Sequence, residues 1–142
     1  MSKTKIPPRL RRKIELSAGY CCGYCLTPQR ITGQKLQIDH IIPETLGGAT
    51  VEENLWLACV SCNSFKGDTI QALDPLTGQI TPLFNPRSQI WIAHFAWSVD
   101  GTEIVGLTPI GRATCEALHL NHVDIVGARW LWVQVGWWPP GR

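Results

Sequence analysis

The chain has 142 residues, which is about the length of one domain and supports a single modest core. Hydrophobic residues make up 44% of the sequence and charged residues 17%, a composition that excludes a disordered chain. No apolar run is long enough to span a bilayer, and the basic start is not followed by the apolar stretch of a secretory signal. We therefore expect a protein that stays in the cytoplasm and does not enter a membrane.

The net charge of +2 conceals an uneven distribution of charge. Residues 1–13 contain six of the thirteen Lys and Arg and no acid, which leaves a net charge of −4 on the remainder. These basic residues are Lys3, Lys5, Arg9, Arg11, Arg12 and Lys13. A basic segment on a nearly neutral body suits a polyanion, because Lys and Arg that neutralise phosphates release counterions. A solubilising tail is the alternative, and charge alone does not decide between them.

In the first half of the chain, the apolar pattern predicts two helices and two extended segments. A helix over residues 9–18, with apolar side chains at i, i+4 and i+8, should end at Gly19. A strand is expected over residues 35–42, followed by a loop that contains a Gly-Gly pair. Residues 51–58 form a second extended piece or a short helical turn. A short helix then follows and stops near Gly67.

After residue 68 the sequence changes character, with a connector rich in Pro and Gly. Most of the seven Trp lie beyond residue 90 and are expected to form an aromatic core, with stacking on nucleic-acid bases as the alternative use. The expected elements are a hairpin of strands 89–99 and 102–107 around a two-residue Asp100-Gly101 turn, a helix capped by Thr108 that ends near Leu118, and a helix capped by Asn121 that ends near Val135.

Six cysteines in a chain expected to lie in a reducing compartment favour metal binding or catalysis over disulfides. Cys22 with Cys25, and Cys59 with Cys62, form two Cys-x2-Cys pairs that each present two thiolates to one tetrahedral Zn²⁺. Cys21 is the alternative to Cys22, with a less favourable spacing. The 33 residues between the pairs exceed the usual zinc-ribbon gap and predict a folded insert. A redox Cys-x2-Cys pair or chance buried cysteines are the other interpretations.

Within that insert, Asp39-His40 ends the predicted apolar strand. A carboxylate beside an imidazole is disfavoured in a core unless a function uses it. In a phosphodiesterase, such a carboxylate holds a divalent metal and such an imidazole takes a proton from water. Judged alone, the pair also fits an exposed turn or a mutual hydrogen bond, just as Asn54 fits a helix cap and Asn63 fits a turn.

Taken together, these residues resemble the HNH endonuclease family. The family motif reads DH-x-x-P, a Gly-Gly loop, N-L and CxxCN-x-x-K, and here Asn replaces the final His of the name. The matching residues are Asp39, His40, Pro43, Gly47, Gly48, Asn54, Leu55, Cys59, Cys62, Asn63 and Lys66. The resemblance implies an α+β fold, in which a ββα-metal module with a zinc knuckle pair occupies residues 1–68 together with the basic N-terminal helix. Residues 69–142 would be a hairpin-and-helix extension packed on it.

The resemblance also implies a function, a metal-dependent endonuclease that hydrolyses DNA phosphodiester bonds. His40 would act as the general base, and Asp39 and Asn63 would hold one catalytic Mg²⁺ or Mn²⁺. Asn54 would pin the loop and orient His40, and Lys66, near the start of the short helix, would contact phosphate. The Zn²⁺ on the four cysteines would be structural. The alternatives are a non-catalytic zinc-ribbon protein that binds nucleic acid and a zinc scaffold for protein interactions.

Overall fold

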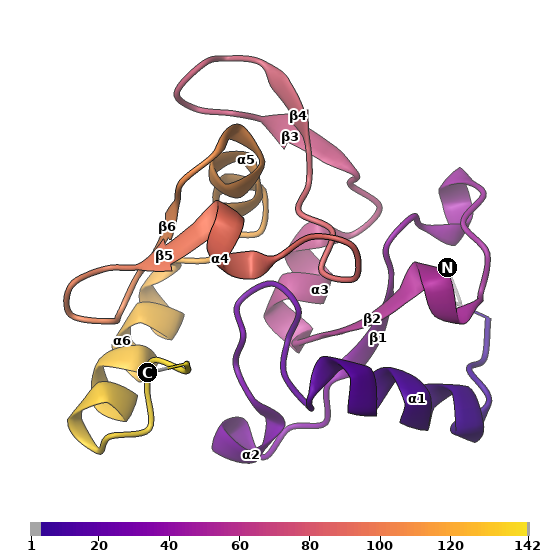
Figure 1. The fold of residues 1–142 in the computed structure, drawn as a ribbon, viewed down its shortest axis with the longest axis horizontal. Coiled ribbons are helices and arrows are strands. Elements are labelled where there is room, and N and C mark those ends of the chain that lie inside the picture. The colour runs from indigo at the N-terminus through magenta and orange to yellow at the C-terminus, as the bar shows by residue number, and fades with distance from the viewer. Residues whose placement is uncertain (1–3, 142) are drawn as a thin grey trace. The chain divides into compact units, whose positions relative to one another are not determined.

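The computed structural model describes residues 4–141, and the chain divides into two compact units. Unit 1 consists of Met1–Ile70 together with Asn85–Ser88, and unit 2 consists of Gln71–Phe84 together with Gln89–Arg142. Figure 1 shows the helices and strands of both units. Within the described residues, no helix combines the length and the apolar character that a membrane crossing needs.

Unit 1 begins with helix α1 (Pro8–Ala18), which confirms the first predicted helix. Its start is favoured by Pro8, whose fixed φ suits the first helical turn and whose missing N–H costs no bond there. It ends at Gly19, which has a left-handed φ of 61° and donates its N–H to the last turn. Between these ends, Ile14 is fully buried and anchors α1 to the core of unit 1.

The centre of unit 1 is a two-stranded antiparallel ribbon of β1 (Gln37–His40) and β2 (Leu55–Ala58), followed by helix α3 (Val60–Lys66). The order is therefore ββα, as predicted. The two strands pair in a register that places Asp39 opposite Trp56 and His40 opposite Leu55. The core beside the ribbon consists of Ile14, Leu36, Ile38, Leu55 and Leu57. Unit 1 also contains three short elements outside the ribbon. They are α2 (Gln29–Thr32), which was not predicted, and the 3-10 helices η1 (Glu44–Leu46) and η2 (Glu52–Asn54).

Over its described residues, unit 2 contains two small antiparallel hairpins and three helices. Thr108 caps α5 by accepting a hydrogen bond from the N–H of Gly111, which confirms that predicted start. The elements are β3 (Gln71–Leu73), β4 (Ile80–Pro82), α4 (Trp91–His94), β5 (Phe95–Trp97), β6 (Ile104–Gly106), α5 (Pro109–Ala117) and α6 (Val123–Gln134).

The connector after residue 68 contains two strands that were not predicted, because β3 and β4 pair within it. The expected hairpin is present with shorter strands, because β5 lies within 89–99 and pairs with β6 within 102–107, while residues 91–94 form α4. The predicted two-residue turn at Asp100-Gly101 is wrong, because Trp97 pairs with Ile104 and a longer loop joins them. His122 rather than Asn121 caps α6. The amide of Asn121 instead binds the backbone N–H and C=O of Ile104.

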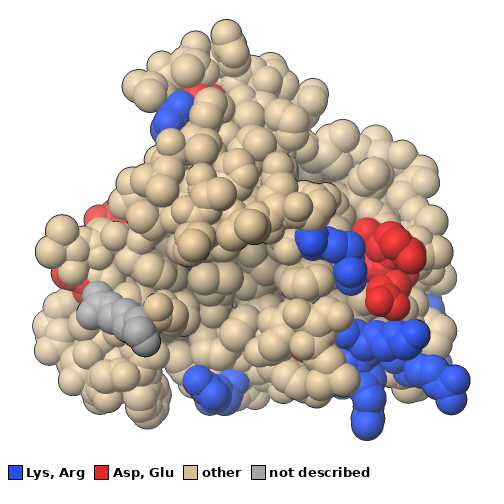
Figure 2. All heavy atoms as spheres, viewed as in Figure 1, with Lys and Arg blue, Asp and Glu red and all other residues tan. Residues whose placement is uncertain are grey.

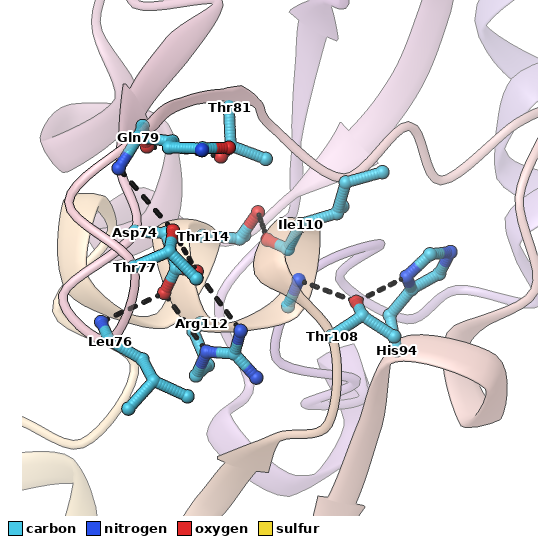
Figure 3. A network of polar contacts seen from close by, with 11 residues as sticks. Asp74, Leu76, Thr77, Gln79, Thr81, His94, Thr108, Ile110, Arg112 and Thr114 are labelled. Carbon is cyan, nitrogen blue, oxygen red and sulfur yellow. Dashed lines mark hydrogen bonds and ion pairs between the residues drawn. The ribbon is translucent and has the colours of Figure 1, made fainter.

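A polar network fixes the first hairpin of unit 2 to α5 (Figure 3). Buried Asp74 accepts two hydrogen bonds from the Arg112 guanidinium, at 2.9 and 3.0 Å, and also binds Leu76 N–H and the Thr77 hydroxyl. The Arg112 bonds hold the pKa of the Asp74 carboxyl well below its ordinary value. Because the donors come from both α5 and the loop 74–79, one carboxylate ties the hairpin to the helix.

The predicted aromatic packing in unit 2 is confirmed for part of the Trp set, whereas Trp130 and Trp137 are exposed. Stacked and edge-to-face pairs connect Trp91 with Phe95 and Trp97, and Trp138 with Trp97 and Trp132. The Arg129 guanidinium lies 5.6 Å from the centre of the Trp97 ring and is fully buried. The rings that pack in this way therefore serve the core of unit 2.

Candidate functional site

The two predicted cysteine pairs meet in one cluster of unit 1. The sulfur atoms of Cys22, Cys25, Cys59 and Cys62 all lie within 4.8 Å of one another. Sulfurs around a tetrahedral Zn²⁺ are about 3.8 Å apart, from Zn–S bonds of about 2.3 Å, and the Cys25 and Cys59 sulfurs are 3.7 Å apart. The geometry therefore fits one Zn²⁺.

The electrostatics of the cluster also favour a cation. Burial raises the pKa of the Cys22 thiol well above its ordinary value, whereas hydrogen bonding to Cys22, Cys59 and Cys62 lowers that of Cys25. Buried thiols packed this closely do not ionise together unless a positive charge offsets their mutual repulsion and the cost of burial. The donor set is the soft, tetrahedral one that structural zinc sites use.

A glycine lets the first cysteine pair approach β2. Gly23 donates its N–H to the carbonyl of Leu57 at 2.9 Å. A Cβ at this position would lie 2.3 Å from the Trp56 ring and 2.7 Å from the side chain of Pro86. Any larger residue at position 23 would push the first cysteine pair away from the second.

Asp39 lies in a buried network on the α3 side of the ribbon. Its carboxylate accepts a 2.8 Å hydrogen bond from the Tyr24 hydroxyl and forms a 3.2 Å ion pair with the Lys66 ammonium. Only 1% of Asp39 and 2% of Lys66 are exposed. Burial, followed by the charge of Asp39, raises the pKa of Tyr24 well above its ordinary value, so Tyr24 remains a hydrogen-bond donor.

The expected position of Lys66 is wrong. Lys66 is the last residue of α3 rather than near its start, and its side chain points into the protein. Besides Asp39, its ammonium binds the carbonyls of His40 at 3.0 Å and of Ile41 at 3.3 Å. These contacts give Lys66 a structural position at the end of β1, so we do not retain it as a phosphate ligand.

His40 lies on the opposite side of β1 from Asp39, because consecutive residues of a strand point to opposite faces. It is 3% exposed, and its ring Nε2 lies 2.9 Å from the hydroxyl of Thr50. The same nitrogen lies 3.8 Å from the carboxylate of Glu44. Both partners belong to the loop between β1 and β2, so this loop covers the imidazole.

Asn54 holds that loop closed. Its side-chain oxygen accepts the N–H of Ile42, and its amide nitrogen donates to the carbonyls of Ile42 and Ala49, all at 2.9 Å. The adjacent chain approaches so closely that a Cβ on Gly48 would lie 1.7 Å from the Ile42 carbonyl oxygen. The second glycine of the Gly-Gly pair is therefore required by space.

Asn63 faces the same side of the ribbon as Asp39. Its amide donates a 2.7 Å hydrogen bond to the side chain of Gln37, which precedes Asp39 by two residues on β1. The structure thus brings Asp39 and Asn63 to one face, whereas His40 lies on the other face at the same end of β1. The amide oxygen of Asn63 remains a donor type that a hard divalent ion accepts.

Several residues that support the site were not predicted from sequence. Tyr24, Glu44 and Thr50 contact Asp39 or His40 only through the fold, and no motif marks them. Arg87 donates to the carbonyl of Leu55 at 3.1 and 3.3 Å, and its guanidinium lies 4.9 Å from the centre of the Trp56 ring. The segment Asn85–Ser88 belongs to unit 1 for this reason, and nothing in its local sequence indicates so distant a partner.

The basic residues near the N-terminus form a charged surface on unit 1. Figure 2 shows Lys and Arg side chains gathered in the region of α1, with acidic atoms beside them. The exposed members of this surface are Lys5, Arg9, Arg12 and Lys13. Arg11 instead pairs with Glu15 at 3.3 Å and donates to the carbonyl of Leu36. Lys3 lies outside the described residues.

Comparison with known families identifies this module. The family model for HNH endonuclease matches residues 22–69, which include both cysteine pairs, the ribbon and α3. Neither the curated proteins nor the solved structures contain a match to the chain. Residues 22–69 therefore form a domain of the HNH endonuclease family that carries a four-cysteine metal-binding cluster.

Proposed function

We propose that the protein is a metal-dependent endonuclease that hydrolyses phosphodiester bonds in DNA. The observation that supports this proposal most strongly is the location of the candidate residues within the family match: Asp39 and His40 end β1, and Asn63 lies on the helix that packs on that strand. The exposed basic surface on α1 adds a nearby place for phosphates.

In this proposal His40 is the general base. Its imidazole takes a proton from water, and the resulting hydroxide attacks phosphorus in line with the leaving oxygen. Asn54 maintains the covering loop by its three hydrogen bonds and so fixes the surroundings of His40.

Asp39 and Asn63 would hold the catalytic divalent ion, for which Mg²⁺ and Mn²⁺ are the candidates. Carboxylate and amide oxygens are suitable ligands for such ions, and both side chains face the same side of the ribbon. The ion would stabilise the charge that develops on the phosphate and the leaving oxygen. Lys66 already compensates the charge of Asp39, so we expect its ammonium to share or release one carboxylate oxygen when the ion binds.

The zinc on the four cysteines is proposed to be structural. Four thiolates complete its tetrahedral shell and leave no position for water or substrate. The cluster instead joins the segment before β1 to the start of α3, where Cys59 caps the helix by accepting from the N–H of Cys62. Zinc would thereby hold the ribbon and α3 in place.

A zinc-containing protein that binds nucleic acid without cutting it is the second candidate. The observation in its favour is that Asp39 and His40 are 1% and 3% exposed, so a phosphate reaches them only after a local movement. Glu44 and Thr50 cover His40 on one side of the strand, and Lys66 and Tyr24 occupy Asp39 on the other.

A plasmid-nicking assay separates the two candidates. Zinc-loaded protein is incubated with supercoiled DNA, with and without Mg²⁺ or Mn²⁺, and a chelator is added as a control. Zinc content is measured afterwards, because a strong chelator removes the structural zinc as well as the added ion. The nuclease predicts nicking that depends on the added ion, is lost in Asn63→Ala and persists in Asn63→His, since imidazole is also a metal ligand. DNA binding without any nicking, at every ion tested, would favour the non-catalytic candidate.

A further inference from the structure

Helix α6, the last helix of unit 2 in Figure 1, exposes an apolar side. Its inner side carries buried Arg129 and half-buried Trp132, a member of the aromatic core. Val123, Trp130 and Leu131 lie on the outer side, where they are 83%, 53% and 60% exposed. Because these three residues follow the i, i+7 and i+8 spacing of a helix, they form one apolar stripe.

Gly127 lies in the middle of this stripe, four residues after Val123 and four before Leu131. Glycine in the interior of a helix is unfavourable relative to alanine, because it loses more conformational freedom on folding. A Cβ at Gly127 would meet no atom of the described chain within 4 Å, so packing within the chain does not require glycine here. The gap suits the close approach of a second helix. We call Val123, Gly127, Trp130 and Leu131 the outer face of α6.

The exposed apolar area is large enough for a specific interface. Val135 and Trp137, which follow the helix, are 59% and 61% exposed and extend the apolar surface. A Trp covers about 250 Å² when it is buried and a Val or Leu about 100 Å², so the five exposed side chains present about 500 Å². Two copies paired by this surface would bury about 1,000 Å², the size at which specific protein interfaces begin.

The charges of unit 2 favour a protein partner over nucleic acid or an anionic membrane. Among the described residues of unit 2, the exposed charged side chains are all acidic: Asp100, Glu103, Glu116 and Asp124. The exposed Lys and Arg of the described chain all belong to unit 1: Lys5, Arg9, Arg12, Lys13, Arg30 and Lys35. Phosphate groups would therefore be repelled by unit 2, and its apolar surface suits a second protein surface.

We propose that a second copy of the chain covers the outer face of α6, with the two helices antiparallel and related by a two-fold axis at Gly127. Under this symmetry Val123 lies near Leu131 of the second copy, and the reverse contact is made as well. Trp130 lies near Asp124 of the second copy, whose carboxylate accepts from the indole N–H. The surface is thus complementary to itself. The inference concerns unit 2 and does not depend on the proposed nuclease function.

Four variants of the full-length, zinc-loaded protein test this pairing. Leu131→Glu and Trp130→Glu each place a charge in the apolar contact. Gly127→Leu fills the gap between the two helices and at the same time favours helix formation. Ile92→Glu is the matched control, because Ile92 is an apolar residue of α4 in the same unit and is 76% exposed.

Sedimentation velocity at chain concentrations of about 1–100 µM gives the mass and the dissociation constant of the dimer. Wild type and Ile92→Glu should approach twice the chain mass of 15.8 kDa as the concentration rises. Leu131→Glu and Trp130→Glu should weaken the dimer by about 30-fold or more, as loss of a central interface residue does. Gly127→Leu should also weaken the dimer, while the urea midpoint of its monomer rises because the helix is more stable.

Wild type that stays monomeric at every concentration would overturn the proposal. A dimer that persists in both Leu131→Glu and Trp130→Glu, or that Ile92→Glu dissociates equally, would place the interface elsewhere and overturn it as well. An unchanged dissociation constant in Gly127→Leu would overturn the axis at Gly127. Circular dichroism and zinc content show which variants are folded. If Trp130→Glu does not fold, Leu131→Glu and Gly127→Leu decide the question.

Discussion

Replacement of Lys66 by methionine tests whether the Asp39–Lys66 pair is structural. The two charges are 3.2 Å apart, with both side chains only 2% exposed. Loss of one member of a buried ion pair leaves the other charge uncompensated and typically costs about 3–5 kcal/mol of unfolding free energy. Lys66→Met should therefore destabilise unit 1 by an amount in that range, because methionine fills the space of the stem but provides no charge.

Lys13→Met is the matched control. Lys13 forms a 3.9 Å pair with Glu52, in which the side chains are 62% and 39% exposed. An exposed pair of this kind contributes about 0.2–1 kcal/mol. Both variants are compared with wild type by urea denaturation in a fixed excess of Zn²⁺, with unfolding of unit 1 followed by protease sensitivity.

A double variant sharpens the comparison. Asp39→Asn combined with Lys66→Met should recover part of the lost stability, because the asparagine still accepts from Tyr24 and no unpaired charge remains. If Lys66→Met is no less stable than Lys13→Met, the ammonium of Lys66 does not compensate Asp39, and the buried network described for the site is wrong.

The remaining predictions concern the zinc, the basic surface and unit 2. Cys59→Ser should lose the single Zn²⁺ and much of the folding free energy, about 10 kcal/mol for such sites, whereas Cys21→Ser should keep the metal; a folded, zinc-free Cys59→Ser in metal analysis and proteolysis would contradict this. Arg9→Gln and Arg12→Gln should each reduce the magnitude of the slope of log affinity for DNA against log salt concentration by about 0.9, the value for one lost phosphate contact. Unchanged slopes in a salt titration would show that this surface only solubilises the protein. Asp74→Asn should lower the unfolding free energy of unit 2 at pH 7. The lowered pKa of Asp74 in the folded protein stabilises unit 2 at pH values above the pKa of the unfolded chain, about 3.9, and protonation of Asp74 removes this stabilisation. The difference in unfolding free energy between wild type and Asp74→Asn in urea denaturation should therefore shrink as pH falls below that value. A difference in unfolding free energy that grows as pH falls would contradict the stabilising role of the ionised Asp74.

Local signals in the sequence were sufficient for the parts of the fold that depend on near neighbours. Gly19 ends α1 and Thr108 begins α5 because their bonds are made within one helical turn. The cysteine pairs were recognisable because the spacing of each pair matches what a tetrahedral metal requires.

Long-range partners explain where sequence reasoning failed. Asn121 does not cap α6 because its side-chain amide bonds the backbone of Ile104, 17 residues earlier, and His122 caps the helix instead. Lys66 was expected near the start of the short helix, where it would contact phosphate, whereas it ends α3 and its partner Asp39 lies 27 residues earlier. Asp100 suggested a tight turn, but its carboxylate binds Ser98 and Thr102 and stabilises a longer loop instead.

Comparison of His40→Ala with wild type on one plasmid substrate tests the proposed nuclease most directly. Equal amounts of folded, zinc-loaded protein are used, and DNA affinity is measured in parallel. The side-chain partners described for His40 are Thr50 and Glu44, which belong neither to the four-cysteine cluster nor to the exposed basic residues. Loss of a general base should slow nicking by about 10²–10⁴ while zinc content and DNA binding persist. If His40→Ala nicks as fast as wild type, His40 is not the base, and the catalytic centre proposed at the end of β1 is wrong.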